Sequence, residues 1–325
     1  MPWILLRTKI SVPALRSGLV ERPHIVALLD RSLEPNRKLA LVSAPAGYGK
    51  TTALAQWAQS RSAHIGWFNI DPEDIDFTRF FRYLVRVWER GHPDSMNSAL
   101  GHLLGSINPD PAEIKTVFAA ATAAAPAPTA IILNDYHLIT APAIHETLSY
   151  VIDHLPPHFH FILAVRGEPP LPLPRYRARG ELLEIGTQEL RFQKQETQEL
   201  LGVLPGLSST VIESLHEQTE GWAVGLQLVS LALQRGLADP EQPAAGGRQR
   251  FELMLHLGQL RLLRRRLDRL AMDNPVLGPG FVRYQGKKAR LFQSIPKLGS
   301  KQDRGRFDRH QEIFLEREPG LAILG

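Results

Sequence analysis

The stretch from Leu39 to Ser60 constrains the fold of this chain more than any other part of it. A short apolar run, Leu39 to Ser43, is followed at once by the loop APAGYG. The segment TTALAQWAQS comes next, and its Leu54, Trp57 and Ala58 have the spacing of one helical face. The expected order is therefore strand, small-residue loop, helix.

The loop fits the phosphate-binding pattern G-x-x-x-x-G-K-[ST], with Ala44 in place of the first glycine. Gly47 and Gly49 can adopt positive φ angles and let backbone N–H groups face phosphate oxygens. Lys50 would then reach the β- and γ-phosphates, and the Thr51 hydroxyl would bind Mg²⁺. We expect the Lys50 amine to lie in a solvated loop when no nucleotide is bound. The alternative is a glycine turn that only caps a helix.

Further strands and helices alternate along the chain. HIGWFNID (64–71) and TAIILNDYHLI (129–139) are predicted strands, and HFHFILAVR (158–166) repeats their apolar pattern. Helices are expected after Asp76 and near 114–125. Strands that are apolar on both faces and alternate with helices are typical of a parallel sheet covered on both sides. From Leu190 onward only helices are expected, including one long helix over 210–233.

Polar side chains at two strand ends are candidates for a catalytic site. Hydrolysis of a nucleotide needs a carboxylate on a neighbouring strand end. Asp135 provides one, preceded by Asn134, which can hold a metal-bound water but brings no charge. Arg166 ends another strand and could sense a γ-phosphate. Asp135 as an ordinary surface acid, and Arg166 as a solvated arginine, are the alternatives.

The charge of the chain is divided between two unlike parts. Residues 1–245 hold 21 Lys and Arg against 25 Asp and Glu, whereas residues 246–325 hold 17 against eight. The absence of cysteine excludes disulfides and thiolate metal sites and fits a reducing compartment. No apolar stretch is long enough for a membrane helix, and no signal-peptide core is present. We therefore expect a cytoplasmic protein with no membrane partner.

Several segments together resemble the ATPase domain of the large LuxR-type, MalT-like transcription regulators, which belong to the signal-transduction (STAND) NTPases. The segments are TKISVPALRSGLVERPHIVALLD, SAPAGYGKTT, IGWFNID, LNDYHLI, RGEPPLPLPRYRARGELLEI and TEGWAVGLQL, and the match covers residues 5 to about 235. The resemblance implies a P-loop NTPase domain over 1–189, a small helical domain over 190–236, and an ATP–Mg²⁺ switch reset by slow hydrolysis. Residues 237–325 resemble nothing in the family. They are expected to be a linker and a basic tail, either a disordered extension or a truncated, out-of-frame end.

The resemblance also implies roles for individual residues. Asn134 and Asp135 would form the strand-end metal site together with Thr51, and Arg166 would be the sensor. The family usually has two acids where Asn134 and Asp135 stand, so this chain departs from the pattern at Asn134. The expected nucleotide-binding residues are Val20, Arg22, Ala44, Pro45, Ala46, Gly47, Tyr48, Gly49, Lys50, Thr51 and Thr52.

Four functions remain open at this point. A switch module would bind ATP and ADP and self-associate or engage a partner protein. A nucleotide-binding scaffold would never hydrolyse ATP, as Asn134 suggests, and a freestanding P-loop ATPase or kinase would turn over faster. The fourth is a DNA-binding protein that works through the basic tail, without sequence preference and with an affinity that falls steeply with salt. Otherwise DNA would be bound only by a missing C-terminal domain.

Overall fold

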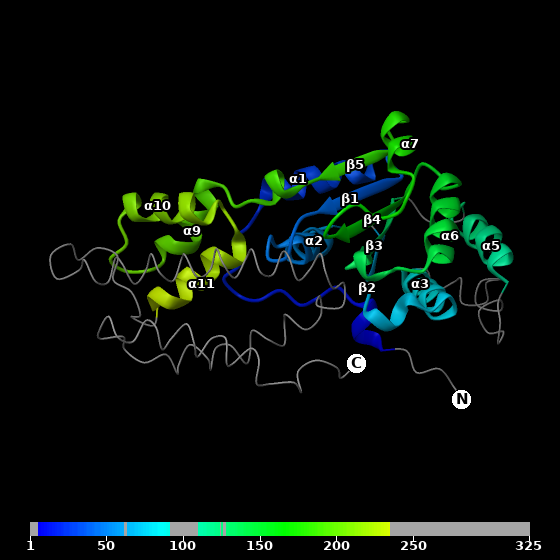
Figure 1. Ribbon diagram of the computed structural model, residues 1–325, viewed down its shortest axis with the longest axis horizontal. Helices are drawn as coiled ribbons and strands as arrows, with labels where there is room; N and C mark the ends of the chain where they lie inside the picture. Colours follow the sequence, from blue (N-terminus) through cyan, green and yellow to red (C-terminus); the bar gives the residue numbers. More distant parts are fainter. Residues whose placement is uncertain (1–5, 62–63, 92–109, 124, 126–127, 235–325) are drawn as a thin grey trace, which may run out of the picture. The chain divides into compact units, whose positions relative to one another are not determined.

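A computed structural model describes residues 6–61, 64–91, 110–123, 125 and 128–234. Its centre is a five-stranded sheet, and the four pairings between neighbouring strands of this sheet are all parallel. The strands lie in the order β2-β3-β4-β1-β5, which Figure 1 shows from bottom to top. Their bounds are His64–Asn69 (β2), Thr129–Asn134 (β3), Phe159–Val165 (β4), Leu39–Ser43 (β1) and Leu182–Ile185 (β5). The predicted α/β class is confirmed.

Two hydrophobic clusters pack on the two faces of the sheet. Alternate strand residues such as Ala40 and Leu41 belong to different clusters, because successive side chains of a strand point to opposite faces. One face is covered by α1 (Pro23–Asp30) and α2 (Lys50–Gln59). The other is covered by α3 (Phe77–Gly91), α5 (Pro111–Ala123), α6 (Pro142–Asp153) and α7 (Leu173–Ala178). This arrangement explains why β3 and β4 are buried along their whole length.

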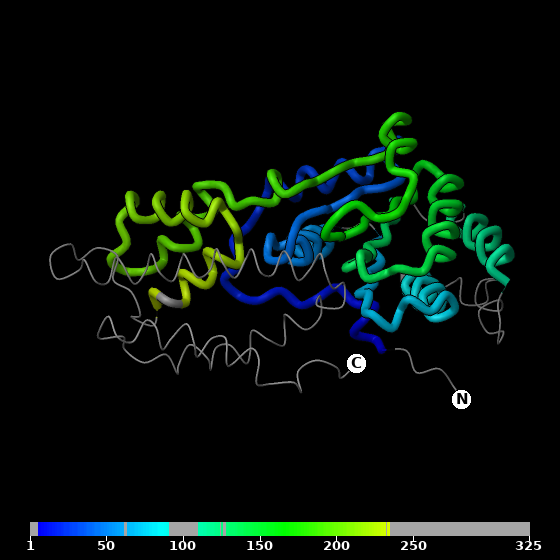
Figure 2. The backbone as a smooth tube through the Cα atoms, viewed as in Figure 1, coloured from blue at the N-terminus to red at the C-terminus, as the bar shows by residue number. Residues whose placement is uncertain are grey.

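Within residues 186–234, only helices follow the last strand. Figure 2 allows the chain to be followed from β5 through α8 (Thr187–Leu190) into α9 (Lys194–Gly202), α10 (Ser209–Thr219) and α11 (Ala223–Gln234). Helices α9 to α11 enclose a third cluster, which includes Leu201, Leu215 and Leu226. A set of helices with its own core is what the sequence predicts here. The boundaries at 189 and 236 stay predictions, and the expected basic tail lies outside the described residues.

The single helix predicted over 210–233 is wrong. Helix α10 ends at Thr219 and α11 begins at Ala223. Glu220 and Gly221 between them have φ angles of 52° and 67°. A side chain at Gly221 would place its Cβ 2.5 Å from the carbonyl oxygen of Phe192, so the close approach of these two backbones requires glycine.

Three short 3₁₀ helices frame the strand ends. They are η1 (Arg7–Ile10), η3 (Pro72–Ile75) and η5 (Tyr136–Leu138), and a fourth, η2 (Arg31–Leu33), follows α1. The predicted N-cap at Asp76 is confirmed, because its Oδ1 accepts a hydrogen bond from the Arg79 N–H at 2.7 Å. The strands predicted over 64–71 and 129–139 end earlier, at Asn69 and Asn134, where these turns begin.

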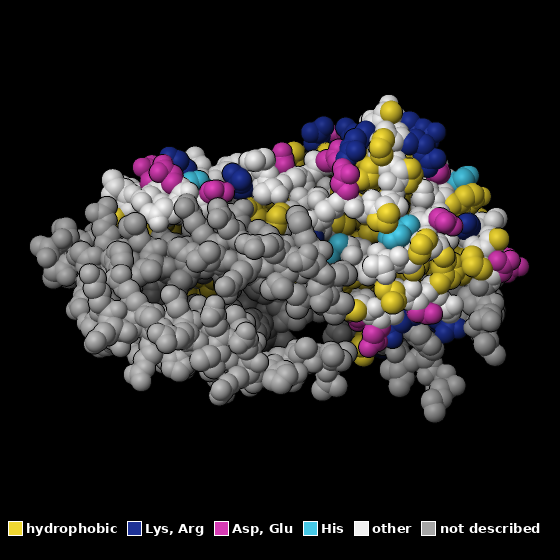
Figure 3. Space-filling model, in the orientation of Figure 1, with side chains coloured by type: hydrophobic (Ala, Val, Ile, Leu, Met, Phe, Trp, Pro, Cys, Tyr) yellow, Lys and Arg dark blue, Asp and Glu magenta, His cyan; other side chains and the backbone are white. Residues whose placement is uncertain are grey.

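Basic side chains around α7 have acidic neighbours. In Figure 3 Lys and Arg side chains gather over α7, beside Asp and Glu. Arg177 donates to Glu168 and to Glu184 at 2.7 Å each, and Arg175 is paired with Asp153. These arginines are therefore partners of acids rather than an open basic surface. No helix among the described residues has the length and apolarity needed to cross a membrane.

Candidate nucleotide-binding site

The loop between β1 and α2 has the conformation that the sequence predicts. Gly47 and Gly49 have φ angles of 87° and 78°. Gly49 is the N-cap of α2, and no side chain caps this helix end. The N–H groups of the first turn are thus left for another acceptor, and the positive end of the helix dipole favours an anion. The loop therefore has the geometry of a phosphate-binding loop.

Lys50 is buried, contrary to the expectation of a solvated amine. Its residue is only 8% exposed, and its Nζ donates to the carbonyl oxygens of Ala44 at 2.6 Å and Pro45 at 3.1 Å. Burial, opposed by the charge of Asp135 and reinforced by that of Arg166, lowers the pKa of Lys50 to about 8. An ammonium group out of water needs acceptors, so it folds back onto the loop carbonyls. A phosphate would replace neutral acceptors with charged ones.

The other loop residues contribute mainly through their backbones. The Tyr48 and Ala44 side chains are 0% and 2% exposed and belong to the hydrophobic cluster beneath the loop. They anchor the loop, so their predicted contact with nucleotide is left to backbone atoms. Pro45 and Ala46 are partly exposed, and Thr52 lies in the first turn of α2.

The structure brings Asn134 into direct contact with the loop. The Thr51 hydroxyl donates to Asn134 Oδ1 at 3.0 Å, and Asn134 Nδ2 donates to Asp135 Oδ2 at 3.2 Å. Asn134 is 4% exposed. The hydroxyl, amide and carboxylate oxygens of these three residues form an all-oxygen donor set, which suits Mg²⁺. Asn134, which the sequence ranks behind Asp135, is the residue that Thr51 contacts.

Asp135 shares its surroundings with two cations. Burial raises the pKa of its carboxyl group, while Lys50 and Arg166 both lower it. Its φ angle of 62° is in the left-handed region, which Asp tolerates better than most residues. Arg166 directly follows β4, and burial lowers its pKa while Asp135 raises it. The carboxylate and both cations therefore gather at the carboxyl edge of the sheet, where parallel α/β folds place their ligands.

Val20 and Arg22 lie elsewhere than at the phosphate loop. The Val20 carbonyl accepts a hydrogen bond from Gln56 Nε2 of α2 at 3.0 Å. The Arg22 guanidinium is 4% exposed and donates to Glu196 Oε1 and to the Arg191 carbonyl, both at 2.8 Å. Arg22 thus ties the segment before α1 to α9. Contact of Val20 and Arg22 with adenine stays a prediction.

Trp222 is a site residue that the sequence reading misses. Its Nε1 donates to the Ala46 carbonyl at 3.2 Å, and the Val224 N–H donates to the Gly47 carbonyl at 3.1 Å. The start of α11 therefore rests on the outer side of the loop. A Gly next to a Trp inside an otherwise regular apolar pattern is the signal that could have revealed it.

His137 is a second residue near the site to which the sequence reading gives no role. Both of its ring nitrogens are buried with no hydrogen-bond partner, and Nδ1 lies 3.9 Å from Asp135 Oδ1. Burial, together with the positive charges of Arg166 and Lys50, lowers the pKa of His137 to about 3. The imidazole is therefore neutral at physiological pH. A neutral ring adds no third positive charge next to Lys50 and Arg166.

Comparison with known proteins gives a clear set of relatives. No family model matches the chain. The HTH-type transcriptional regulator MalT of Cronobacter sakazakii is 32% identical over 250 residues, which cover 74% of this chain and 27% of the relative. The protein of the same name from Serratia proteamaculans is 33% identical over 247 residues, 74% of this chain and 26% of the relative.

Solved structures match only distantly. A RuvB variant of Thermotoga maritima has a TM-score of 0.36 at 12% identity, covering 74% of this chain and 70% of that one. Drosophila ORC bound to DNA has a TM-score of 0.37 at 12% identity, covering 93% and 91%. The resemblance read from the sequence motifs is confirmed by the sequence relatives. Over about three quarters of its length the chain is a homologue of the HTH-type transcriptional regulators named MalT, and it spans about a quarter of their length.

Proposed function

We propose that this chain contains the ATP-binding switch module of a MalT-like transcription regulator, and that slow hydrolysis of ATP returns the module to its resting state. The observation that carries the proposal is the arrangement around Lys50. A buried amine is held by two loop carbonyls, with Asp135 and Arg166 close enough to shift its pKa. A phosphate group is the ligand that this set of charges and N–H groups fits best.

Each part of the site has a role in this proposal. The loop from Ala44 to Gly49 and the first turn of α2 would bind the phosphates, with Lys50 on the β- and γ-phosphates. Thr51, Asn134 and Asp135 would hold Mg²⁺, which supplies positive charge to the phosphate oxygens when it is bound. Arg166 would sense the terminal phosphate from the end of β4. The chain itself would position these groups, and Trp222 would hold the loop in place through its hydrogen bond to the Ala46 carbonyl.

The helical segment gives the switch a way to respond. Trp222 and Val224 are bonded to the loop carbonyls of Ala46 and Gly47, and Glu196 is bonded to Arg22. A loop that closes on phosphate would change the first pair of contacts and move α11. We propose that this change controls self-association or contact with a partner protein, in the cytoplasm, and that DNA is read outside this module.

Asn134 supports one rival function. An amide brings no charge to the metal site, so a scaffold that binds ATP without hydrolysing it is the second candidate. Single-turnover hydrolysis, with protein in excess over labelled ATP and with Mg²⁺, separates the candidates. We expect hydrolysis far slower than the roughly 1–100 s⁻¹ of kinases, faster in Asn134→Asp and slower in Asp135→Asn. Asp153→Asn, at the end of α6, is the control and should match the unaltered chain.

The outcomes differ for each function. Bound ATP that is never hydrolysed, in the unaltered chain and in Asn134→Asp alike, would favour the scaffold. A rate in the kinase range would favour a freestanding enzyme. No bound ATP at all would exclude both the switch and its rivals.

A further inference from the structure

A line of hydrogen bonds runs from the core of the sheet to the phosphate loop. The Trp67 indole Nε1 donates to Asn69 Oδ1 at 2.8 Å, and Asn134 Nδ2 donates to the same oxygen at 3.2 Å. The Thr51 hydroxyl donates to Asn134 Oδ1 at 3.0 Å. Asn69 and Asn134 are register partners at the ends of β2 and β3, so the sheet itself places their amides side by side.

The direction of this line follows from its first member. An indole N–H can only donate, so the atom of Asn69 that faces Trp67 must be its oxygen. That oxygen can only accept, so the atom of Asn134 that faces it must be the amide nitrogen. The oxygen of Asn134 is therefore turned toward Thr51. Because Trp67 is 1% exposed and packed among other side chains, the donor cannot turn away to water.

The orientation of Asn134 matters for the metal. Only the oxygen of an amide can bind Mg²⁺ or accept a hydrogen bond from a metal-bound water. Asn134 Nδ2 also donates to the Asp135 carboxylate, at 3.2 Å. Without Asn69 this would be the one remaining hydrogen bond from Nδ2, within the described residues, to hold the amide in its orientation. In a chain with a carboxylate at position 134 both atoms would be oxygens, and no such control would be needed.

We propose that Asn69 is a positioning residue that holds the Asn134 oxygen toward Thr51 and so supports Mg²⁺-assisted nucleotide binding. The inference rests on the proposed function of this site. Asn69 acts through Asn134 and need not touch the nucleotide. The Trp67 indole N–H determines which atom of Asn69, and therefore of Asn134, donates and which accepts.

The test is the gain in ATP affinity that Mg²⁺ provides, measured by calorimetric titration with ATP in Mg²⁺ and in EDTA. Asn69→Leu removes the acceptor at similar volume, and we expect the gain from Mg²⁺ to fall about tenfold, while affinity in EDTA changes less than about twofold. Asn69→Asp keeps an acceptor oxygen in place and should retain the gain. A residue needed only for folding would weaken binding under both conditions.

A second pair of variants keeps the test decisive if Asn69→Leu fails to fold. Trp67→Phe removes the indole donor but keeps an aromatic ring in the core. Trp57→Phe is its match, because Trp57 of α2 donates from Nε1 to Oδ1 of Asp30, at the end of α1, at 2.9 Å and outside this line. We expect Trp67→Phe to reduce the gain about threefold and Trp57→Phe to leave it unaltered.

Three results would overturn the inference. An unchanged gain in Asn69→Leu, an equal loss with and without Mg²⁺, or equal behaviour of the two Trp→Phe variants would each show that Asn69 does not orient Asn134. If the unaltered chain binds no ATP at all, the proposed function itself fails and this inference fails with it. The two failures are distinguished by the unaltered chain.

Discussion

At the scale of single residues, the backbone at position 47 has two requirements that only glycine meets. Its φ angle of 87° is in the region that side chains disfavour. A Cβ at this position would also lie 2.6 Å from Trp222 Nε1 and 3.1 Å from Val224 Cβ. Glycine is therefore needed at position 47 both for the turn of the loop and for the close packing of Trp222 and Val224 against the loop.

We predict that Gly47→Ala destabilises the chain more than Gly49→Ala does. Both positions have positive φ, so both variants carry backbone strain of about 1 kcal/mol. Only Gly47 has a neighbour in the way, since a Cβ at Gly49 meets nothing within 4 Å. The clash should add roughly 1–3 kcal/mol to the loss of unfolding free energy, as overpacking does. Urea unfolding of both variants measures the difference.

The same comparison has an internal check. Combining Gly47→Ala with Trp222→Leu removes the ring that causes the clash, so the extra loss should be smaller in the double variant than the single losses predict. Equal losses for Gly47→Ala and Gly49→Ala would mean that Trp222 does not rest on the loop in solution.

Sequence reading finds the residues of the site whose role depends on local pattern. The loop from Ala44 to Thr51 and the polar end of β3 are recognisable because a motif and a strand end are both local features. Burial of Lys50, by contrast, depends on how the loop folds back on itself. The pairing of Arg22 with Glu196 joins residues 174 positions apart, which no local pattern contains. Asn69 escapes notice because a polar residue at a strand end is ordinary until its partner is known.

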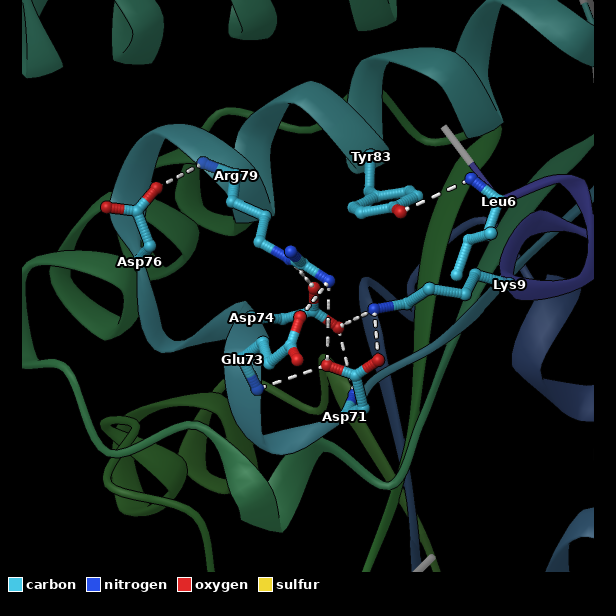
Figure 4. A network of polar contacts seen from close by, with 8 residues as sticks. All are labelled: Leu6, Lys9, Asp71, Glu73, Asp74, Asp76, Arg79 and Tyr83. Atoms are coloured by element: carbon cyan, nitrogen blue, oxygen red, sulfur yellow. Dashed lines mark hydrogen bonds and ion pairs between the residues drawn. The ribbon is translucent and has the colours of Figure 1, made fainter. Parts of the chain in front are cut away.

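At the scale of elements, a buried ionic cluster ties η1 to the turn after β2. Figure 4 shows Lys9 of η1 pointing at Asp71 and Asp74, with Arg79 of α3 approaching from the other side. Lys9 Nζ lies 2.7 Å from Asp71 Oδ2 and 4.5 Å from the centre of the Tyr83 ring. Asp74 is 0% exposed and Arg79 Nε donates to its Oδ1 at 2.9 Å. The cluster therefore fixes the start of the described chain against α3.

We predict that Lys9→Met lowers the unfolding free energy by about 3 kcal/mol, because it leaves the buried Asp74 carboxylate with Arg79 as its remaining cation. Lys194→Met is the matched control. Its exposed ion pair with Glu213, at 3.8 Å, should contribute at most about 1 kcal/mol. Denaturant titration of both variants is the measurement. Similar losses of unfolding free energy in the two variants would show that this cluster does not hold η1 in place.

Two features that the sequence does not reveal, strand β5 and the break between α10 and α11, have a pattern that is too short or that continues without interruption. Strand β5 has four residues and an exposed Glu184 in it, so it lacks the apolar run of a central strand. The break between α10 and α11 is hidden because apolar spacing continues across Glu220 to Trp222. By contrast β1 is predicted with its observed bounds, since β4 and β5 flank it and both of its faces are buried.

At the scale of the whole molecule, the described part of the chain is a parallel α/β fold whose loop between β1 and α2 is hydrogen-bonded to the start of a helical segment. The chain spans about a quarter of the length of its MalT relatives, so the activity of a full regulator is a proposal for this chain. The basic residues beyond 245 lie outside the described part. The central claim for the described part is that the loop between β1 and α2 binds nucleotide.

The most direct measurement is calorimetric titration of the full chain with ATP and Mg²⁺, comparing Lys50→Ala with Lys194→Ala, whose side chain is 54% exposed on α9. We expect the unaltered chain and Lys194→Ala to bind one ATP with equal affinity. The ATP affinity of Lys50→Ala should be at least about a hundredfold lower, since a buried charge-assisted contact to phosphate is removed. Its unfolding free energy should not fall, because removing a buried amine relieves its desolvation. Unchanged ATP affinity in a folded Lys50→Ala would contradict the account, and the loop would then be only a turn.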